Sequence, residues 1–242
     1  MHRHYFFDLD NTLTRSKSLI APEHVPILQS LAERAEVIVV SGSSAAVIAK
    51  HLTVALAGQY HTLAQNGNLA LTRAGALQWE RTLTQSQKDA AHAFIAKARA
   101  HLAIPVRNER DIVEDRGCQL AYSLIGHNEE IAKKEAFDPD HAIPHALLRE
   151  LAEDLAVLEA AGIEARRGGT TNIDMFGRGQ HKGFNVREYI EAQGWKTEEC
   201  IYIGDALFPG GNDETVIGVI ETHPVGDYRE TYRYLESVLR TA

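Results

Sequence analysis

The 242-residue sequence contains only two cysteines, Cys118 and Cys200, and they stand far apart. Such a pair provides neither a disulfide scaffold nor a CxxC metal site, and it suits a reducing compartment. Histidine is plentiful at twelve residues, but no HExxH motif occurs. The spacing therefore does not indicate a zinc enzyme.

Long apolar runs are also missing. No segment approaches the length of a membrane span, and the N-terminus leads into an apparent strand without the layout of a signal peptide. Acidic residues outnumber basic ones, which gives a formal net charge of −8. That sign argues against a protein that coats nucleic acid, so any anionic ligand must be held by a local basic site. We expect a cytoplasmic protein with no membrane or nucleic-acid partner, and a homodimer is left open.

The sequence does contain short apolar runs that each end in polar residues. They lie in the segments Tyr5–Asp8, Glu36–Ser44 and Cys200–Asp213, and helical patterns occur at Pro26–Arg34 and Lys182–Gln193. Near-continuous apolar runs are typical of strands that are buried on both faces of a parallel sheet. Alternation of such strands with helices indicates an α/β fold, in which ligands bind beyond the carboxyl ends of the strands.

The middle of the chain follows a different pattern. Two long amphipathic helices are predicted over Thr84–Leu102 and Pro144–Ile163, with strand-like pieces between and after them. This is an α+β segment inserted into an α/β chain. We predict a core domain of residues 1–82 and 182–242, with a cap domain of residues 83–181 between its two parts.

The stretch YFFDLDNTLT, from Tyr5 to Thr14, places two carboxylates one residue apart directly after an aromatic run. If the chain stays extended, Asp8 and Asp10 lie on the same side, where two like charges repel each other. A metal ion or a lysine is needed to offset them. The alternative is that both residues only cap a helix or form an Asx turn before Thr12.

Four motifs then occur in order along the chain. They are DLDNT (Asp8–Thr12), Ser41 in VVSGS, Lys182, and GDALFPGGND (Gly204–Asp213). In order and context they resemble the motifs of the haloacid dehalogenase (HAD) superfamily. The closer resemblance is to eukaryotic-type phosphomannomutases, which have a C2-type (type IIB) cap, and AQNG, RGCQLAYSLIGH, RGGTTNIDMFGRGQHK and GDALFPGGND carry it. It implies a Rossmann-like HAD core with a parallel sheet and an inserted α+β cap.

The resemblance also implies roles for these residues. Asp8 would attack phosphorus and become an aspartyl-phosphate, while Asp10 would act as general acid and then as general base. Ser41 would donate a hydrogen bond, and Lys182 a point charge, to the phosphoryl oxygens. The implied cofactor is Mg²⁺, a hard cation that takes oxygen ligands. Its protein ligands would be the Asp8 carboxylate, the Asp10 backbone carbonyl and Asp205, with Asp213 as an acidic support nearby.

Each motif has a plainer interpretation when it is taken alone. Ser41 could be a turn residue or a helix N-cap, and Lys182 could be a solvated residue in a first helical turn. A set of Asp, Ser and Lys also fits a phosphorelay receiver, but such modules are about half this length and have no inserted cap. A silent sugar-phosphate binder would not need Asp10 as well as Asp8.

Evidence for the substrate lies in the predicted cap. Arg107, Arg110 and Arg116 cluster between the two cap helices. They are either a solvated charged face or a clamp for the distal phosphate of a sugar phosphate. Arg116 opens the segment that resembles the phosphomannomutase cap signature. The resemblance places further substrate contacts at His127, Thr171, Asn172 and Asp174.

The sequence departs from the mutase pattern at several positions, and two of these departures bear on the reaction. His127 stands where the mutase signature ends in arginine, and Lys17 stands in place of another mutase arginine. A mutase must hold a bisphosphate intermediate while it turns over, so these losses favour hydrolysis. The sequence therefore predicts a Mg²⁺-dependent phosphatase that acts on a hexose phosphate through an aspartyl-phosphate. The alternative is a phosphomannomutase, or another hexose phosphate mutase, that interconverts mannose 1-phosphate and mannose 6-phosphate.

Overall fold

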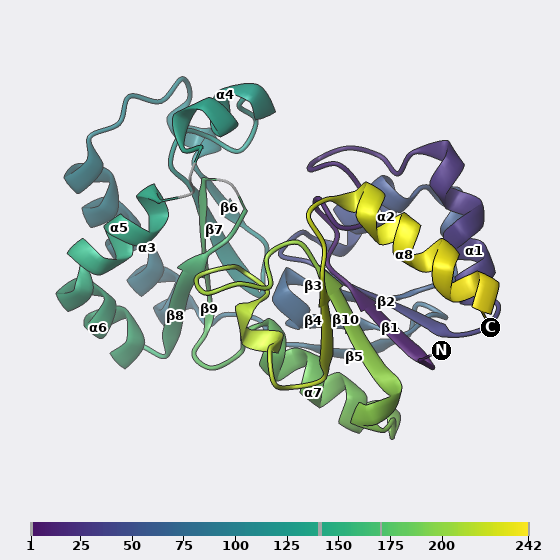
Figure 1. Cartoon of the computed structure of the whole chain (residues 1–242). Helices are drawn as coiled ribbons and strands as arrows, with labels where there is room; N and C mark the ends of the chain where they lie inside the picture. The colour runs from purple at the N-terminus through teal and green to yellow at the C-terminus, as the bar shows by residue number, and fades with distance from the viewer. Residues whose placement is uncertain (1, 140–141, 170, 242) are drawn as a thin grey trace. The chain divides into compact units, whose positions relative to one another are not determined.

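The computed structural model describes residues 2–139, 142–169 and 171–241. The chain forms two compact units, both drawn in Figure 1. The core unit comprises Met1–Glu80 and His181–Ala242, and the cap unit comprises Arg81–Gln180.

The core unit is built on a seven-stranded sheet with the strand order β11-β10-β1-β2-β3-β4-β5. The neighbours from β11 to β3 pair in parallel, and β4 and β5 extend the sheet as antiparallel strands. Strand β1 is thus the middle one of the five parallel strands and lies between β10 and β2. The bounds are β1 His4–Phe7, β2 Glu36–Val40, β3 His61–Ala64, β4 Leu69–Leu71, β5 Leu77–Glu80, β10 Cys200–Gly204 and β11 Glu221–Pro224.

Apolar clusters on both faces of this sheet explain the aromatic run that opens the chain. Tyr5 and Phe7 belong to a cluster that includes residues of helices α1, α2 and α8, whereas Phe6 belongs to a second cluster that includes residues of α7. Side chains alternate along a strand, so a strand covered on both faces needs apolar residues at every position. The bounds are α1 Val25–Ala32, α2 Ala45–Leu52, α7 Lys182–Gln193 and α8 Tyr228–Thr241.

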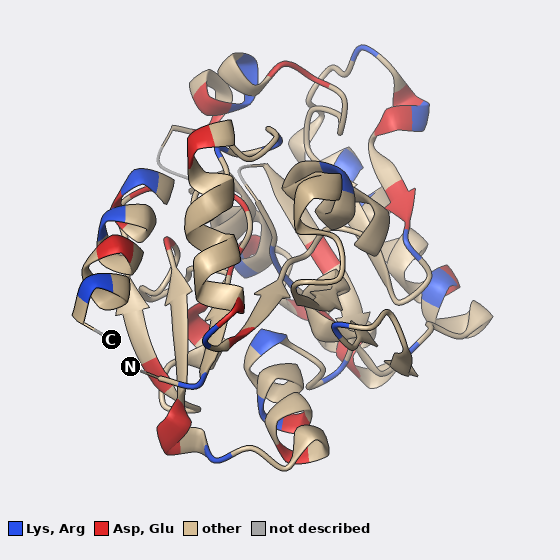
Figure 2. Ribbon diagram, turned by 90° about the vertical axis from the view of Figure 1, so that its right-hand side faces the viewer, with Lys and Arg blue, Asp and Glu red and all other residues tan. Residues whose placement is uncertain are grey.

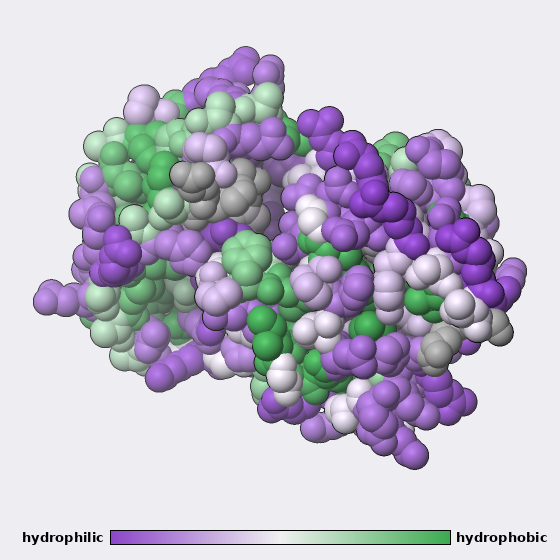
Figure 3. Space-filling model, viewed as in Figure 1, coloured by the Kyte–Doolittle hydropathy of each residue, from purple (hydrophilic) through white to green (hydrophobic). Residues whose placement is uncertain are grey.

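The surface carries interspersed charges. Helix α8 buries Tyr232 and Leu235 while Arg229, Arg233 and Glu236 are exposed, and Figure 2 shows acidic and basic residues along its length. Hydrophilic side chains predominate on the face drawn in Figure 3. Within the described ranges, no helix has both the length and the hydropathy to cross a bilayer.

The cap unit contains a four-stranded antiparallel sheet with the order β6-β7-β9-β8. One face of this sheet packs against helices of the cap unit. Leu120 and Tyr122 of β7 belong to the same apolar cluster as Phe94 and Leu147, which lie in two of these helices. The parallel sheet and the inserted α+β unit confirm the predicted fold class. The bounds are α3 Gln85–Leu102, β6 Val113–Asp115, β7 Gln119–Ser123, α4 Ile131–Phe137, α5 Ile143–Glu150, α6 Ala152–Ala160, β8 Ile163–Arg167 and β9 Asn172–Gly177.

The prediction of one long helix over Pro144–Ile163 was wrong. Two helices, α5 and α6, occupy this stretch and meet at Leu151, whose backbone has φ −98° and ψ 33°. Helical residues have ψ near about −42°, so the peptide after Leu151 turns out of the helical path. The hydrogen bonds from Leu151 N to Leu147 O and from Leu155 N to Leu151 O remain, which makes the junction a kink.

Candidate active site

The candidate site lies at the carboxyl ends of three neighbouring strands of the core sheet. Asp8 directly follows β1, Ser41 directly follows β2, and Asp205 directly follows β10. Because β10, β1 and β2 are adjacent and parallel, their carboxyl ends share one edge of the sheet. The Asp8 N–H donates to Ile203 O at 3.0 Å, which fixes the start of the loop after β1 against β10.

A buried lysine joins two carboxylates at this edge. Lys182 Nζ donates to Asp8 Oδ1 at 2.6 Å and to Asp213 Oδ1 at 2.7 Å. All three side chains are buried. Lys182 is the first residue of α7, whose N-cap His181 accepts a hydrogen bond from Phe184 N through Nδ1. A cation in the first turn of a helix opposes the helix dipole, so helix position alone does not explain Lys182. The two buried carboxylates that it contacts do.

The electrostatics of the cluster follow from its burial. Burial raises the pKa of Asp8 well above its ordinary value, and nearby Lys182 only partly opposes this. Burial alone would lower the pKa of Lys182, but the carboxylates of Asp213 and Asp8 outweigh it and raise that pKa. For Asp205, burial and the charge of Asp213 raise the pKa to about 6. The site thus holds more negative charge than its one lysine compensates.

The donor set fits a hard divalent cation. One oxygen from each of Asp8, Asp205 and Asp213 lies within 4.8 Å of the others. Carboxylate oxygens at such spacing suit Mg²⁺, whose charge would offset the excess that Lys182 leaves. The structure brings together three of the four residues predicted as metal ligands. Asp10 is not in this group, and its predicted contribution through the backbone carbonyl stays a prediction.

Asp10 holds the loop that follows it. Its Oδ1 accepts a hydrogen bond from Lys17 N at 2.8 Å, and Asn11 Oδ1 accepts one from Ser16 N at 3.3 Å. Asn11 and Lys17 both have positive φ, 58° and 55°. Asparagine tolerates this backbone region better than most residues, which accounts for its place after Asp10. One oxygen of Asp10 thus orients the loop, but it does so through a residue seven positions further along and not as the Asx turn before Thr12 that the alternative described.

Thr12 is a site residue that the sequence analysis missed. Its hydroxyl accepts a hydrogen bond from Asp205 N at 3.0 Å and donates to Asp205 Oδ1 at 3.3 Å. The side chain is fully buried. The only sequence signal was its place at the end of the DLDNT motif, because Asp205 is 193 positions away.

Ser41 is buried, and its Oγ accepts a hydrogen bond from Ser43 N at 3.1 Å. The hydroxyl hydrogen can still be donated to a ligand. The alternative that Ser41 caps a helix was wrong, since the N-cap of α2 is Ser44, whose Oγ accepts from Val47 N. The turn interpretation of Ser41 does describe its bond to Ser43.

Two glycines of the last motif allow close packing around the site. A Cβ on Gly204 would lie 2.5 Å from Asp213 Oδ2, and one on Gly211 would lie 1.9 Å from Ala206 O. Neither contact is tolerable for an ordinary side chain. Gly204 therefore lets the Asp213 carboxylate pack directly against β10, and Gly211 lets its loop pack against the backbone of Ala206.

In the cap unit, Arg116 and His127 are both near Glu114. Arg116 Nη2 and Nε lie 2.5 and 3.0 Å from Glu114 Oε2, and His127 Nδ1 lies 3.8 Å from the same oxygen. His127 is buried, with Nε2 3.0 Å from Ala121 O. Burial lowers the pKa of His127 below its ordinary value. Arg107 and Arg110 are both exposed. Arg110 lies in a short 3-10 helix at Glu109–Asp111, and Arg107 lies just before it.

The remaining predicted cap residues lie on or beside β9. Asp174 stands opposite both Ala121 and Arg166 in the sheet, and Asn172 stands opposite Ser123. Three atoms here are buried and have no hydrogen-bond partner among the described residues: Ser123 Oγ, Thr171 Oγ1 and Asn172 Oδ1. Buried polar groups are normally paired, so this end of the cap sheet is suited to a polar ligand. Ser123 was missed from the sequence, although it lies inside the cap signature.

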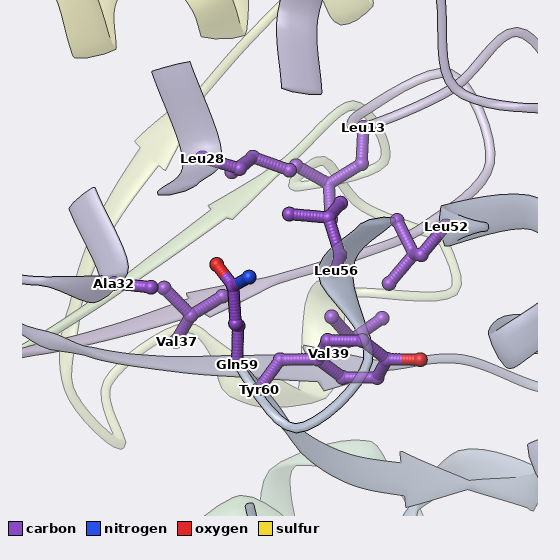
Figure 4. A pocket seen from close by; sticks show the side chains of 9 residues that line it. All are labelled: Leu13, Leu28, Ala32, Val37, Val39, Leu52, Leu56, Gln59 and Tyr60. Carbon is purple, nitrogen blue, oxygen red and sulfur yellow. The ribbon is translucent and has the colours of Figure 1, made fainter. Parts of the chain in front are cut away.

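A cavity elsewhere in the core unit is lined mostly by apolar side chains. Leu13, Leu28, Val39 and Leu52 line it together with other apolar residues, and Gln59 and Tyr60 are the polar residues among the described lining (Figure 4). Its lining is largely part of the apolar cluster around α1 and α2. We assign it to the packing of the core.

The fold and the site together define the class. A parallel sheet with Asp8, Ser41 and Asp205 at its strand ends, a buried lysine and an inserted cap is the arrangement of a HAD-superfamily enzyme that transfers phosphoryl groups. An IMP-bound IMP-nucleotidase mutant from Plasmodium falciparum has this fold, with a TM-score of 0.73 and 12% identity over 99% of this chain and 68% of that one. BT1666 from Bacteroides thetaiotaomicron, described among HAD phosphatases, has a TM-score of 0.62 and 14% identity over 98% and 95%. At such identities the likeness shows the fold alone.

The chain belongs to the eukaryotic phosphomannomutase family, whose sequence model matches residues 25–241. Phosphomannomutase 1 of Dictyostelium discoideum is 29% identical to it over 214 residues, which cover 86% of this chain and 83% of that protein.

Proposed function

We propose that this protein is a hexose phosphate mutase of the phosphomannomutase type, which moves a phosphoryl group through Asp8. The observation that carries the phosphoryl-transfer chemistry is the contact of Lys182 Nζ with Asp8 Oδ1 beside Asp205 and Asp213. Membership of the phosphomannomutase family supports the mutase over the hydrolase that the sequence alone favoured.

In the first half of the proposed reaction, a hexose bisphosphate is the donor: an Asp8 oxygen forms a bond to phosphorus as the bond to the sugar oxygen breaks. Asp10 gives its proton to that leaving oxygen. Lys182 donates to the phosphoryl oxygens, and Ser41 adds a hydrogen bond. In the second half, a sugar hydroxyl loses its proton to Asp10 and attacks the phosphoryl group, which releases Asp8.

Asp8, Asp205 and Asp213 are the residues that would hold Mg²⁺. When bound, this ion supplies positive charge that stabilises the transferring phosphoryl oxygens. Asp213 also holds Lys182, so the same carboxylate serves the lysine and the acidic cluster.

The cap unit is proposed to supply the contacts to the rest of the sugar phosphate. Arg116 offers a fork-shaped donor that matches phosphate oxygens. Thr171, Asn172 and Asp174 offer hydrogen-bonding groups in the same unit, and two of them have buried atoms without partners among the described residues. Arg107 and Arg110 are exposed, and they remain the weaker candidates for the clamp.

Hydrolysis is the second candidate, and His127 favours it. A mutase of this family has an arginine there, whereas the His127 ring is buried and its pKa is lowered by that burial. At neutral pH this ring supplies no fixed positive charge to retain a bisphosphate.

The test is to incubate the protein with Mg²⁺ and mannose 1-phosphate, with and without a hexose bisphosphate, and to follow free phosphate and mannose 6-phosphate together. Asp8→Asn serves as the blank. Mannose 6-phosphate that forms only with the bisphosphate supports the mutase. Free phosphate that forms without it contradicts the mutase and supports hydrolysis.

A further inference from the structure

Tyr202 lies beneath the site, in the middle of β10. Its side chain is fully buried, and its hydroxyl donates to Asp213 Oδ1 at 2.7 Å. Lys182 Nζ donates to the same oxygen at 2.7 Å and to Asp8 Oδ1 at 2.6 Å. A continuous line of hydrogen bonds thus runs from the Tyr202 phenol through Asp213 and Lys182 to Asp8.

This line fixes the orientation of the Asp213 carboxylate. The torsion that turns a carboxylate about its last bond is broad, so packing or hydrogen bonds must choose its angle. Here Oδ1 receives two donors, Tyr202 and Lys182, while Oδ2 lies 3.4 Å from Ala206 N and faces the space that Gly204 leaves open. The Tyr202 hydroxyl therefore helps to keep Oδ1 of Asp213, and not Oδ2, turned toward Lys182.

The orientation of Asp213 in turn determines where Lys182 points. The ammonium group has three N–H donors in freely rotating geometry, unlike the rigid fork of arginine. If Asp213 turned, the ammonium would follow it and move away from Asp8 Oδ1. A displacement of about 1 Å at a reacting group can cost about a hundredfold in rate.

We infer that Tyr202 is a positioning residue of the transfer site, which acts through Asp213 to hold Lys182 Nζ on Asp8. The inference rests on the proposed phosphoryl-transfer chemistry and adds a residue that lies outside all four motifs. The opposing account is that Tyr202 only packs, since it shares an apolar cluster with Phe6 and Tyr189.

Tyr189 provides a matched control for that opposing account. It is also fully buried in the same cluster, and its hydroxyl lies 2.7 Å from a side-chain atom, His61 Nδ1. His61 belongs to β3 and lies at the start of that strand, opposite the carboxyl ends where Asp8, Ser41 and Asp205 stand. Tyr189→Phe and Tyr202→Phe therefore remove one buried hydroxyl each, with the same change in shape.

The experiment compares the wild type, Tyr202→Phe and Tyr189→Phe in steady-state kinetics and in binding of beryllofluoride with Mg²⁺, followed by ¹⁹F NMR. Beryllofluoride mimics the phosphoryl group on an aspartate and needs no sugar. We expect Tyr202→Phe to lower kcat and beryllofluoride affinity by about tenfold or more, with KM changed by less than about twofold. Tyr189→Phe leaves both readouts near the wild-type values, although thermal unfolding shows a similar loss of stability in the two variants.

Equal effects of the two substitutions on kcat and beryllofluoride binding would overturn the inference, because Tyr202 would then only pack. An adduct that fails to form in the wild type, where Asp8 is intact, would overturn the proposed phosphoryl transfer and the inference with it. The two failures are thus distinguishable.

Discussion

Thr12 and Asp205 hold each other through a single hydroxyl, which accepts from the Asp205 backbone N–H and donates to the Asp205 carboxylate. The pair links the loop after β1 to the loop after β10. It also satisfies one carboxylate oxygen of a residue in the acidic cluster. Groups that orient a metal ligand from behind typically change metal affinity by about ten- to a hundredfold when they are removed.

Thr12→Val removes this hydroxyl without changing the shape of the side chain. We expect the Mg²⁺ concentration for half-maximal activity to rise by about tenfold, because Asp205 loses its orientation. Thr14→Val is the control, since Thr14 is also buried but its hydroxyl lies 3.5 Å from a backbone carbonyl, Leu9 O. A Mg²⁺ requirement that is the same in both variants would remove Thr12 from the site.

Lys182→Met leaves Asp8 and Asp213 buried without their cation. Removal of one partner of a buried ion pair costs about 3 to 5 kcal/mol, because the remaining charge is uncompensated. We expect a loss of that size in the free energy of unfolding, measured by denaturant titration in the presence of a chelator, together with a loss of activity. The double variant Asp8→Asn with Lys182→Met should regain part of the stability, and no recovery would contradict the proposed coupling between the two side chains.

The affinity for Mg²⁺ should fall as the solution becomes more acidic. In the metal-free protein the pKa of Asp205 is about 6, above its ordinary value of 3.8, and that of Asp8 is raised in the same direction. A raised pKa means that the folded protein binds a proton at Asp205 more tightly than the unfolded chain does. Protonation therefore stabilises the fold, fully below the unfolded pKa, and this stabilisation is lost as the pH rises through about 6. Protons and Mg²⁺ therefore compete for these carboxylates.

Calorimetric titration of Mg²⁺ at pH values of about 5 and about 7.5 tests this competition. Binding should be weaker at the lower pH and should release protons into the buffer. Asp205→Asn is expected to bind Mg²⁺ more weakly but with a smaller dependence on pH. Equal affinity at both pH values in the wild type would show that the cation does not displace protons from this cluster.

His127→Arg tests whether the histidine that replaces the mutase arginine affects the choice between transfer and hydrolysis. The new guanidinium would lie near Glu114, whose Oε2 is 3.8 Å from the His127 ring, and would restore a fixed positive charge. We expect the ratio of mannose 6-phosphate to free phosphate to rise. His127→Gln, which adds no charge, should leave the ratio unchanged. A ratio that does not move in His127→Arg would mean that the cap histidine does not decide between transfer and hydrolysis.

The strand ends were predictable because their chemistry is local. Each apolar run ends in its polar group within one or two residues, as at Phe7 and Asp8, so the sheet edge follows from the sequence. The meeting of Lys182 with Asp8 followed from the family motifs. What could not be predicted were contacts that depend on exact packing. Thr12 with Asp205 and Tyr202 with Asp213 pair through hydroxyls whose direction is set only in the folded core.

Local signals failed where several residues offered the same chemistry. Four positions around the end of β2 contain three serines, and only the structure shows that Ser44 caps α2 while Ser41 forms a turn. The helical pattern of Pro144–Ile163 is continuous in hydropathy, and nothing in it marks the kink at Leu151. Arg107, Arg110 and Arg116 looked alike in sequence, yet Arg116 pairs with Glu114 whereas Arg107 and Arg110 are exposed.

The central claim is that Asp8 carries the phosphoryl group. The direct measurement is rapid acid quenching of the protein with Mg²⁺ and a hexose bisphosphate, followed by mass spectrometry of the intact chain and of its peptides. The account predicts one phosphoryl group per chain on Asp8, absent from Asp8→Asn. A chain that turns over substrate without a phosphoryl group, or with one on a residue other than Asp8, would contradict it.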